Sequence, residues 1–244
     1  MATSKSRMLG FVSCANDEAV LAQRLLASPC LSGSDYALAV HVGAASAAAA
    51  FNAEMARRPQ AEWLVWVHQD VFLPAGWDGR FIGAIREAEE RFSRLAVVGA
   101  YGVAGAGAQT VRAGHVLDRG RMLQEATPLP CCADSLDELL FAVRADSGLT
   151  LDPALGFDFY ATDLVLTAQE RGFDVAVVEA YCEHWSGTPR IGVPSGIAER
   201  VSASGDFFER KWAHRLPLQT PCFSICKQGD VAAQCRALAG AGFP

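Results

Sequence analysis

Polar side chains that could bind a metal ion follow two apolar segments of the chain. The segment WLVWVHQDVFLPAGW is apolar up to His68, Gln69 and Asp70, and a Pro-Gly loop comes next. Far along the chain, the apolar segment 173–180 is followed by His184. A carboxylate and an imidazole from distant segments suit Mg²⁺ or Mn²⁺, which use few protein carboxylates and bridge phosphate groups. The pattern favours a divalent metal site that also holds a diphosphate.

Both residues also have a simpler explanation. Asp70 could only cap the turn that follows its strand, and His184 could be a strand-end histidine with satisfied hydrogen bonds. The residues alone leave these alternatives open.

A third group of polar residues follows the first apolar segment, residues 8–15. The group consists of Ser13, Asn16, Asp17 and Glu18. In an open parallel sheet, ligands bind beyond the carboxyl ends of the strands. If the three apolar segments are strands of one such sheet, the three polar groups lie along one edge of it.

The elements that must position these groups alternate along the first half of the chain. Apolar segments predict strands, and amphipathic segments between them predict helices, one of which is capped by Ser46. This alternation indicates an α/β domain with a parallel sheet and helices on both faces. The predicted strands are 8–15, 36–42, 62–69 and 95–103, and the predicted helices are 17–28, 46–58 and 79–92.

The second half of the chain is less regular. It predicts a hairpin over 114–126, strands over 137–146 and 173–180, and helices over 162–172, 202–216 and the last residues. Thr162 is the expected cap of the 162–172 helix. With no internal repeat and no clear linker, we expect one domain over residues 1–216 and a C-terminal extension over 217–244.

The composition excludes several classes of protein. The 244 residues are 51% hydrophobic and the net charge is −6, which is typical of a globular protein with a sizeable core. The 21 basic residues are scattered, so we expect no nucleic-acid partner. No apolar segment approaches about 18 residues, so no integral membrane segment is expected. The first residues make a poor secretory signal, which favours a cytoplasmic location. A homo-oligomer stays one option for the assembly.

The eight cysteines are expected to be reduced. Cys222, Cys226 and Cys235 with His214 could suggest a zinc site, but their spacing matches no common zinc pattern.

Several motifs occur together in an order that resembles a known family. They are FVSCANDE, FNAEM, WLVWVHQDVFLPAGW, DELLFAVRAD, GFDFYATDLVLTAQERGFDVAVVEAYCEHWSG and KW, between Phe11 and Trp212. The chain resembles a family-2-type glycosyltransferase, and more narrowly the small glycosyltransferase-like domain associated with streptomycin biosynthesis. The resemblance implies the GT-A fold, a Rossmann-like three-layer sandwich around a mixed, mostly parallel central sheet.

The resemblance also implies roles for single residues. Asp70 matches the last aspartate of the family's Asp-x-Asp signature, and His184 matches a histidine that completes the metal site. Asp163 matches the catalytic base, although it could simply be a helix N-terminal charge, and Asp158 is a rival for the role. The implied contacts to the nucleotide-sugar donor are Val12, Ser13, Asn16, Glu18, Asn52, His68 and Gln69.

The implied activity is metal-dependent, inverting transfer of a sugar from a nucleotide sugar to an unknown acceptor, with Mn²⁺ or Mg²⁺ as the cofactor. His68 and Thr162 stand where the family has acids, so the alternative is an inactive GT-A protein that binds a nucleotide or a partner. A sugar-nucleotide pyrophosphorylase is less favoured, because the first strand lacks a following Gly-rich loop with Arg and Lys. Segment 186–196, with Arg190, is interpreted as a lid.

Overall fold

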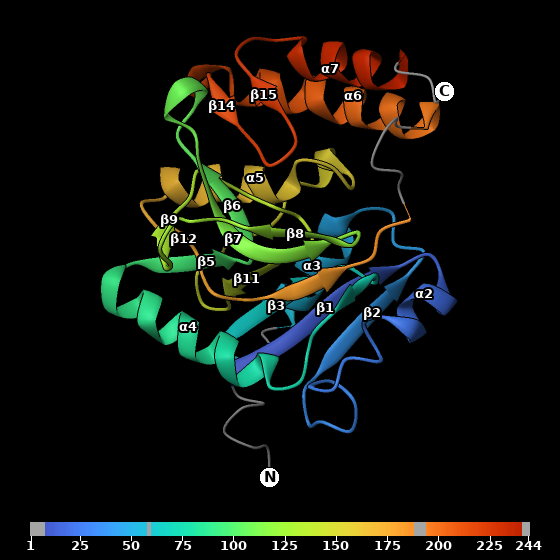
Figure 1. Cartoon of the computed structure of the whole chain (residues 1–244), viewed down its shortest axis with the longest axis vertical. Coiled ribbons are helices and arrows are strands. Elements are labelled where there is room, and N and C mark those ends of the chain that lie inside the picture. The colour runs from blue at the N-terminus through green and yellow to red at the C-terminus, as the bar shows by residue number, and fades with distance from the viewer. Residues whose placement is uncertain (1–7, 58–59, 188–193, 241–244) are drawn as a thin grey trace.

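The computed structural model describes residues 8–57, 60–187 and 194–240. At its centre lies β3 (Trp63–Val67), all five residues of which are buried. β3 pairs in parallel with β1 (Leu9–Ala15) and antiparallel with β11 (Leu140–Arg144), in a seven-stranded sheet of order β2-β1-β3-β11-β5-β12-β9 (Figure 1). The other strands of this sheet are β2 (Leu38–Val42), β5 (Leu95–Gly99), β9 (Cys131–Cys132) and β12 (Asp174–Val177).

The central sheet is mixed and mostly parallel, as predicted. β1 pairs in parallel with both β2 and β3, and β12 pairs in parallel with β5. Because β11 is antiparallel to both β3 and β5, these two groups of strands run in the same direction. Only β11 and β9 run against them. The predicted strand 137–146 is therefore present, but as a shorter strand inserted in the opposite direction.

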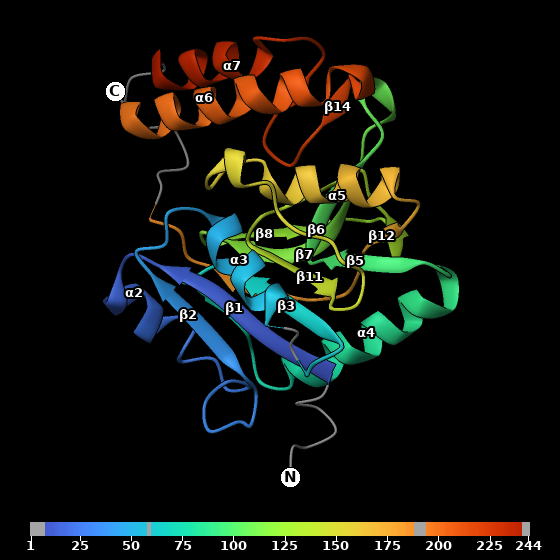
Figure 2. The same ribbon diagram turned by 180° about the vertical axis from the view of Figure 1, so that it is seen from behind.

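Helices cover both faces of the central sheet and give the expected three layers (Figure 2). One face packs on α2 (Glu18–Gln23) and α4 (Trp77–Arg91), and the other packs on α3 (Ala47–Ala56) and α5 (Tyr160–Glu170). Alternate β3 residues enter the two cores, with Val65 on one side and Trp66 on the other, as the two-residue period of a strand requires.

Two helix starts show how the sequence sets the elements. The Ser46 hydroxyl accepts a hydrogen bond from the backbone N–H of Ala49, which confirms the predicted cap of α3. The helix predicted over 162–172 is present as α5, but its predicted cap was wrong, because the helix begins at Tyr160 with Phe159 at its cap position in a left-handed conformation, φ 64°. Thr162 instead exchanges a hydrogen bond of 2.8 Å with the Ser135 hydroxyl.

A second sheet packs beside the first, with strand order β10-β6-β7-β13-β4 and β8 paired to β7. The predicted single strand 95–103 is divided between the two sheets, because the chain leaves β5 and enters β6 around Ala100. Gly114 of β7 passes this junction so closely that a Cβ would lie 2.3 Å from the Ala100 oxygen. The bounds are β4 (Val71–Phe72), β6 (Tyr101–Ala104), β7 (Val111–Asp118), β8 (Arg121–Gln124), β10 (Ser135–Leu136) and β13 (Cys182–His184).

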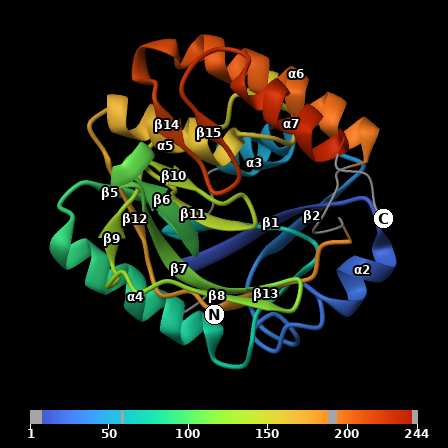
Figure 3. The same ribbon diagram turned by 45° about the horizontal axis from the view of Figure 1, so that its top comes forward.

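The C-terminal part of the chain forms a third core on the outer side of α5 (Figure 3). Phe208, Trp212 and Val231 pack there against Phe159 and Leu166. No described helix is both long and apolar enough to cross a membrane. The elements of this part are α6 (Ser195–Lys211), α7 (Asp230–Gly240), β14 (Leu218–Gln219) and β15 (Ser224–Ile225), and the short 3₁₀ turns of the chain are Gly107–Gln109, Pro153–Leu155 and Ala213–Arg215.

Candidate metal and nucleotide site

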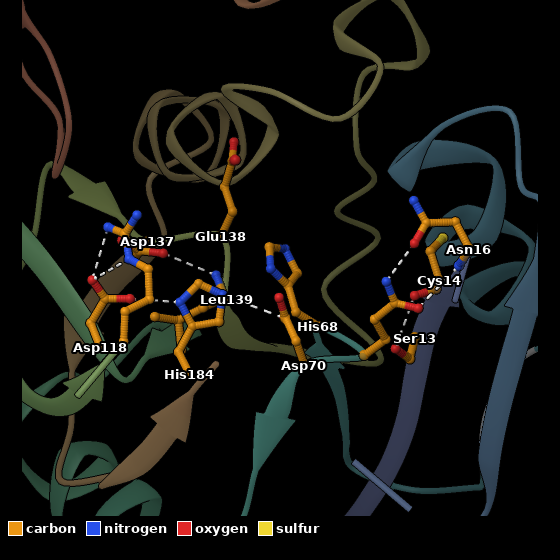
Figure 4. A network of polar contacts seen from close by, with 12 residues as sticks. Ser13, Cys14, Asn16, His68, Asp70, Asp118, Asp137, Glu138, Leu139 and His184 are labelled. Carbon is orange, nitrogen blue, oxygen red and sulfur yellow. Dashed lines mark hydrogen bonds and ion pairs between the residues drawn. The ribbon is translucent and has the colours of Figure 1, made fainter. Parts of the chain in front are cut away.

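Three side chains from distant parts of the sequence gather at the carboxyl end of β3. They are His68, Asp70 and His184, and one ligand atom of each lies within 4.8 Å of the others. His184 reaches the site because β13 pairs antiparallel with β4, directly after Asp70, and places Nε2 of His184 3.4 Å from Oδ1 of Asp70. Among the described residues, no other set of three such side chains converges in this way. We call these three residues the cation cluster (Figure 4).

Asp118 fixes the orientation of His184. Its Oδ1 lies 2.9 Å from Nδ1 of the imidazole, and the Arg119 guanidinium bonds to the other carboxylate oxygen. Asp118 is held there by the parallel pairing of β7 with β13 and by the tight β7–β8 turn, in which Arg119 and Gly120 both have positive φ. Metal-bound histidines commonly donate their second ring N–H to a carboxylate, and this contact directs Nε2 of His184 toward the cluster.

His68 is held from the other side by α5. Its Nε2 lies 2.8 Å from the hydroxyl of the buried Tyr160, so a cation would take Nδ1. Burial lowers the pKa of His68 to about 4, which keeps the imidazole neutral. Burial alone would also lower the pKa of His184, but its bonds with Asp118 and Asp70 raise it to about 9. Two imidazoles and one carboxylate form a donor set that fits a divalent transition-metal ion.

The loop between β1 and α2 is tied to the cation cluster by Gln69. Oε1 of Gln69 accepts hydrogen bonds from the backbone N–H groups of Asn16 (3.0 Å) and Asp17 (3.1 Å), and Nε2 donates to Oδ1 of Asn16. Glu18 is exposed at the start of α2. The structure thus brings Asn16 and Gln69 together. Asn16 lies on the side of the cluster where the β1–α2 loop runs (Figure 4).

Three of the residues predicted to contact the donor have side chains that bond or pack within the protein. The Val12 side chain is fully buried in the core on the α3 side, and Ser13 is also buried, with its hydroxyl directed to the Cys14 oxygen. The Asn52 carboxamide bonds in both directions to the backbone of Leu151, each at 2.8 Å. The side chains of Val12 and Asn52 therefore make scaffold contacts in this structure, and their contact with a donor stays a prediction.

Asp163 does not lie in the cation cluster. Its side chain is 2% exposed, and its Oδ1 accepts from the Trp212 indole at 2.8 Å and pairs with Lys211 at 2.6 Å. Both partners belong to the end of α6, so Asp163 joins α5 to the C-terminal core. These contacts are what the structure shows for Asp163, and its role as a base stays a prediction.

Two carboxylates to which the sequence pattern assigned no role lie beside the cation cluster. Asp137 and Glu138 lie in the loop between β10 and β11, and the next residue, Leu139, accepts a hydrogen bond from the backbone N–H of His68. Burial raises the pKa of Glu138 well above its usual value, and the charges of Asp158 and Asp137 add to the rise. The two adjacent acids of the DELL segment were a sign of a polar site. They were not recognised as such, because the predicted strand 137–146 included both of them, whereas the observed strand begins at Leu140.

Two other expectations concern the ends of the chain and the lid. Among the described residues, Cys222, Cys226, Cys235 and His214 do not form a metal group, so the structure contradicts the zinc interpretation. Arg190 and most of the expected lid lie outside the described residues.

No protein-family model matches the chain, and no curated protein matches it. Solved structures do match. The mannosyltransferase PcManGT from Pyrobaculum calidifontis, in complex with GDP-Man and Mn²⁺, has a TM-score of 0.51 at 10% identity, over 94% of this chain and 68% of that one. The chain has the GT-A fold. GalNAc-T7, with UDP, GalNAc and Mn²⁺, matches at a TM-score of 0.46 and 12% identity, over 86% of this chain and 52% of that one. In this GT-A chain the cation cluster lies at the carboxyl end of the central parallel strands.

Proposed function

We propose that the chain is a glycosyltransferase that uses a divalent metal ion and a nucleotide-sugar donor. The observation that carries the proposal is the convergence of His68, Asp70 and His184 in a GT-A fold, next to the β1–α2 loop. PcManGT, which has the same fold, was solved with a nucleotide sugar and Mn²⁺. Ligands of open α/β sheets bind at this edge of the strands.

The residues of the cation cluster would hold Mn²⁺ or Mg²⁺. When bound, the cation would stabilise the negative charge that grows on the departing diphosphate. The backbone of the β1–α2 loop, with Asn16, would face the nucleoside, and Gln69 would hold that loop against the cation cluster. Glu18 would stand at its exposed rim.

We also propose Glu138 as the general base, in place of Asp163. Glu138 lines a cavity beside the cation cluster, and its carboxylate accepts hydrogen bonds from the backbone N–H groups of Phe159 and Tyr160. The raised pKa makes it a stronger base than an ordinary carboxylate. The acceptor oxygen would bond to the anomeric carbon and pass its proton to Glu138. The bond from that carbon to the phosphate would break, and the diphosphate would leave with the electron pair, inverting the configuration.

Calorimetry tests the metal–nucleotide part of this proposal. UDP, GDP and dTDP are titrated with and without Mn²⁺, and we expect at least one to bind only with the metal. Asp70→Asn and His184→Gln should abolish that binding, whereas the exposed Asp146→Asn and His214→Gln serve as matched controls. Absence of any metal-linked nucleotide binding would contradict the proposal.

Turnover of donor sugars tests the base. We expect Glu138→Gln to lower kcat by about 10²–10⁴-fold while nucleotide affinity stays unchanged. Asp163→Asn should leave kcat nearly unchanged and lower stability by about 1–3 kcal/mol, because it weakens buried bonds to Lys211 and Trp212. The reverse pattern would restore Asp163 as the base. Nucleotide binding with no turnover of any donor would instead favour the non-catalytic alternative.

A further inference from the structure

A cavity of about 410 Å³ lies next to the cation cluster. This volume falls in the range of roughly 300–1,000 Å³ that small-molecule pockets occupy. None of the predicted donor residues lines it. One end is formed by Arg119, Asp137 and Glu138, and Arg119 bonds to Asp118, which orients His184. The cavity therefore opens beside the point where a sugar would leave its diphosphate.

Most of the wall is apolar. The cavity is lined by Ile197 and Val201 of α6, Leu238 of α7, Phe223 of the β14–β15 loop, and Phe159. The Phe159 and Phe223 rings lie 5.5 Å apart, and the Leu238 side chain is left 44% exposed. Phe159 also holds the left-handed conformation that starts α5, and backbone strain of this kind clusters at ligand sites. An apolar wall of this size favours an apolar or aromatic occupant.

The charged residues of the cavity disfavour an anion. Arg200 donates two hydrogen bonds of 3.0 Å to Asp158, and Arg119 is paired with Asp118, so both arginines on the wall already bond to carboxylates. The remaining ionisable groups at the inner end are Asp137 and Glu138. Carboxyl groups accept hydrogen bonds from hydroxyls and repel a second anion.

We propose that this cavity binds the acceptor, and that the acceptor is a small hydroxyl-bearing molecule with an apolar or aromatic body and no anionic group. Its hydroxyl would meet Glu138 at the inner end, and its body would lie against the apolar wall that Phe159, Phe223 and Leu238 form. The assignment of this molecule as acceptor rests on the proposed function, but the binding preference does not.

Three matched probes test the preference on the full chain with Mn²⁺ and UDP present. 4-Nitrophenyl β-glucoside is neutral and aromatic, 4-nitrophenyl β-glucuronide adds one carboxylate, and methyl β-glucoside lacks the aromatic body. By ligand-detected NMR titration, we expect the nitrophenyl glucoside to bind at least about tenfold more tightly than either of the others, because an unpaired carboxylate is costly to bury.

A substitution that adds a positive charge to the cavity wall tests whether the probes bind in this cavity. Leu238→Arg supplies an uncommitted cation at an exposed position, and we expect it to raise the affinity for the glucuronide by about tenfold. Leu26→Arg, at a leucine outside the cavity that is 43% exposed where Leu238 is 44% exposed, should change nothing. If both variants behave alike, the probes bind elsewhere and the inference is wrong.

The outcomes separate the two proposals. Equal or tighter binding of the glucuronide or of methyl glucoside by the unmodified chain, or no binding of any probe, would overturn the acceptor inference even if nucleotide binding requires Mn²⁺. If metal-linked nucleotide binding is absent but the preference and the Leu238→Arg effect hold, the cavity is a site for neutral aromatic hydroxyl compounds and the glycosyltransferase proposal fails.

Discussion

Single residues outside the cation cluster set its properties. Asp118 and Tyr160 each bond one imidazole of the cluster, so the two histidines are held in fixed orientations before any cation arrives. Such preorganisation lowers the entropic cost of binding, and second contacts of this kind influence metal affinity strongly.

Asp118→Asn is predicted to weaken Mn²⁺ binding by roughly 10–100-fold, because His184 loses its charged partner. The measurement is a Mn²⁺ titration in the presence of the nucleotide that binds best. Asp146→Asn, which is exposed and remote from the cluster, should keep the affinity of the unmodified protein. An unchanged affinity in Asp118→Asn would show that the contact does not orient the histidine.

Ionisation of Glu138 is predicted to lower the free energy of unfolding as the pH rises. Burial and the neighbouring acids raise its folded pKa well above 4.5, so the folded state binds its proton more tightly than the unfolded state does. This stabilisation is fully present below about pH 4.5 and is lost as the pH rises through the folded pKa. Glu138→Gln should therefore match the unmodified chain near pH 4 and exceed its stability at pH 8, as measured by urea unfolding.

Asp163→Asn serves as the comparison in the same urea experiment. Because this change weakens buried hydrogen bonds, it should lower stability at pH 8. If Glu138→Gln also lost stability at pH 8, the ionised Glu138 carboxylate would not be destabilising the fold, and the prediction would be wrong.

At the scale of elements, the proposed acceptor cavity depends on how α7 packs on α6. The two helices meet at Gly205, where a Cβ would lie 2.4 Å from Cγ1 of Val231. Leu238, on the next turns of α7, lines the cavity. The α6–α7 contact therefore fixes one wall of the proposed acceptor site.

Gly205→Ala is predicted to destabilise the fold by about 1–3 kcal/mol, because the added methyl group forces α7 away from α6. Gly83→Ala is the matched control, since Gly83 lies within α4 and a Cβ added there would meet nothing within 4 Å. That control should stabilise by up to about 1 kcal/mol through helix propensity. Equal effects of the two changes, measured by urea unfolding, would mean that the helices do not pack closely at Gly205.

At the scale of the whole molecule, the cation cluster joins both sheets. Asp70 and His68 follow β3 of the central sheet, whereas His184 and Asp118 belong to β13 and β7 of the second sheet. Gln69 and Tyr160 add the β1–α2 loop and α5 to the same network. A ligand bound here would contact parts of the protein that are distant in sequence and would stabilise the entire fold.

The melting temperature is accordingly predicted to rise only when Mn²⁺ and a suitable nucleoside diphosphate are present together. At a ligand concentration of 100 times Kd, the expected stabilisation is about 2.7 kcal/mol. Addition of EDTA should return the melting temperature to that of the protein without ligands, and Asp70→Asn should show no shift. A nucleotide-dependent shift that survives EDTA would argue against a metal-bridged complex.

The sequence by itself determined the elements and the candidates for metal binding. Apolar strands such as Trp63–Val67 and caps such as Ser46 depend on neighbouring residues, so local patterns predict them. The placement of His68, Asp70 and His184 at strand ends is also a local property. For His68 and Asp70 this edge could be expected from the rule that ligands bind where parallel strands end. His184 reaches the same place from β13 of the second sheet, through its pairing with β4.

Only the tertiary structure decided which side chains meet. The pairing of β7 with β13 gives His184 its partner Asp118, and the packing of α6 on α5 engages Asp163 with Lys211. These contacts join residues 66 and 48 positions apart, and no local pattern encodes such a distance. Strand pairing and helix packing depend on contacts throughout the core. The contacts of Asp118, Asp163 and Glu138 could therefore not be predicted from their neighbours in sequence.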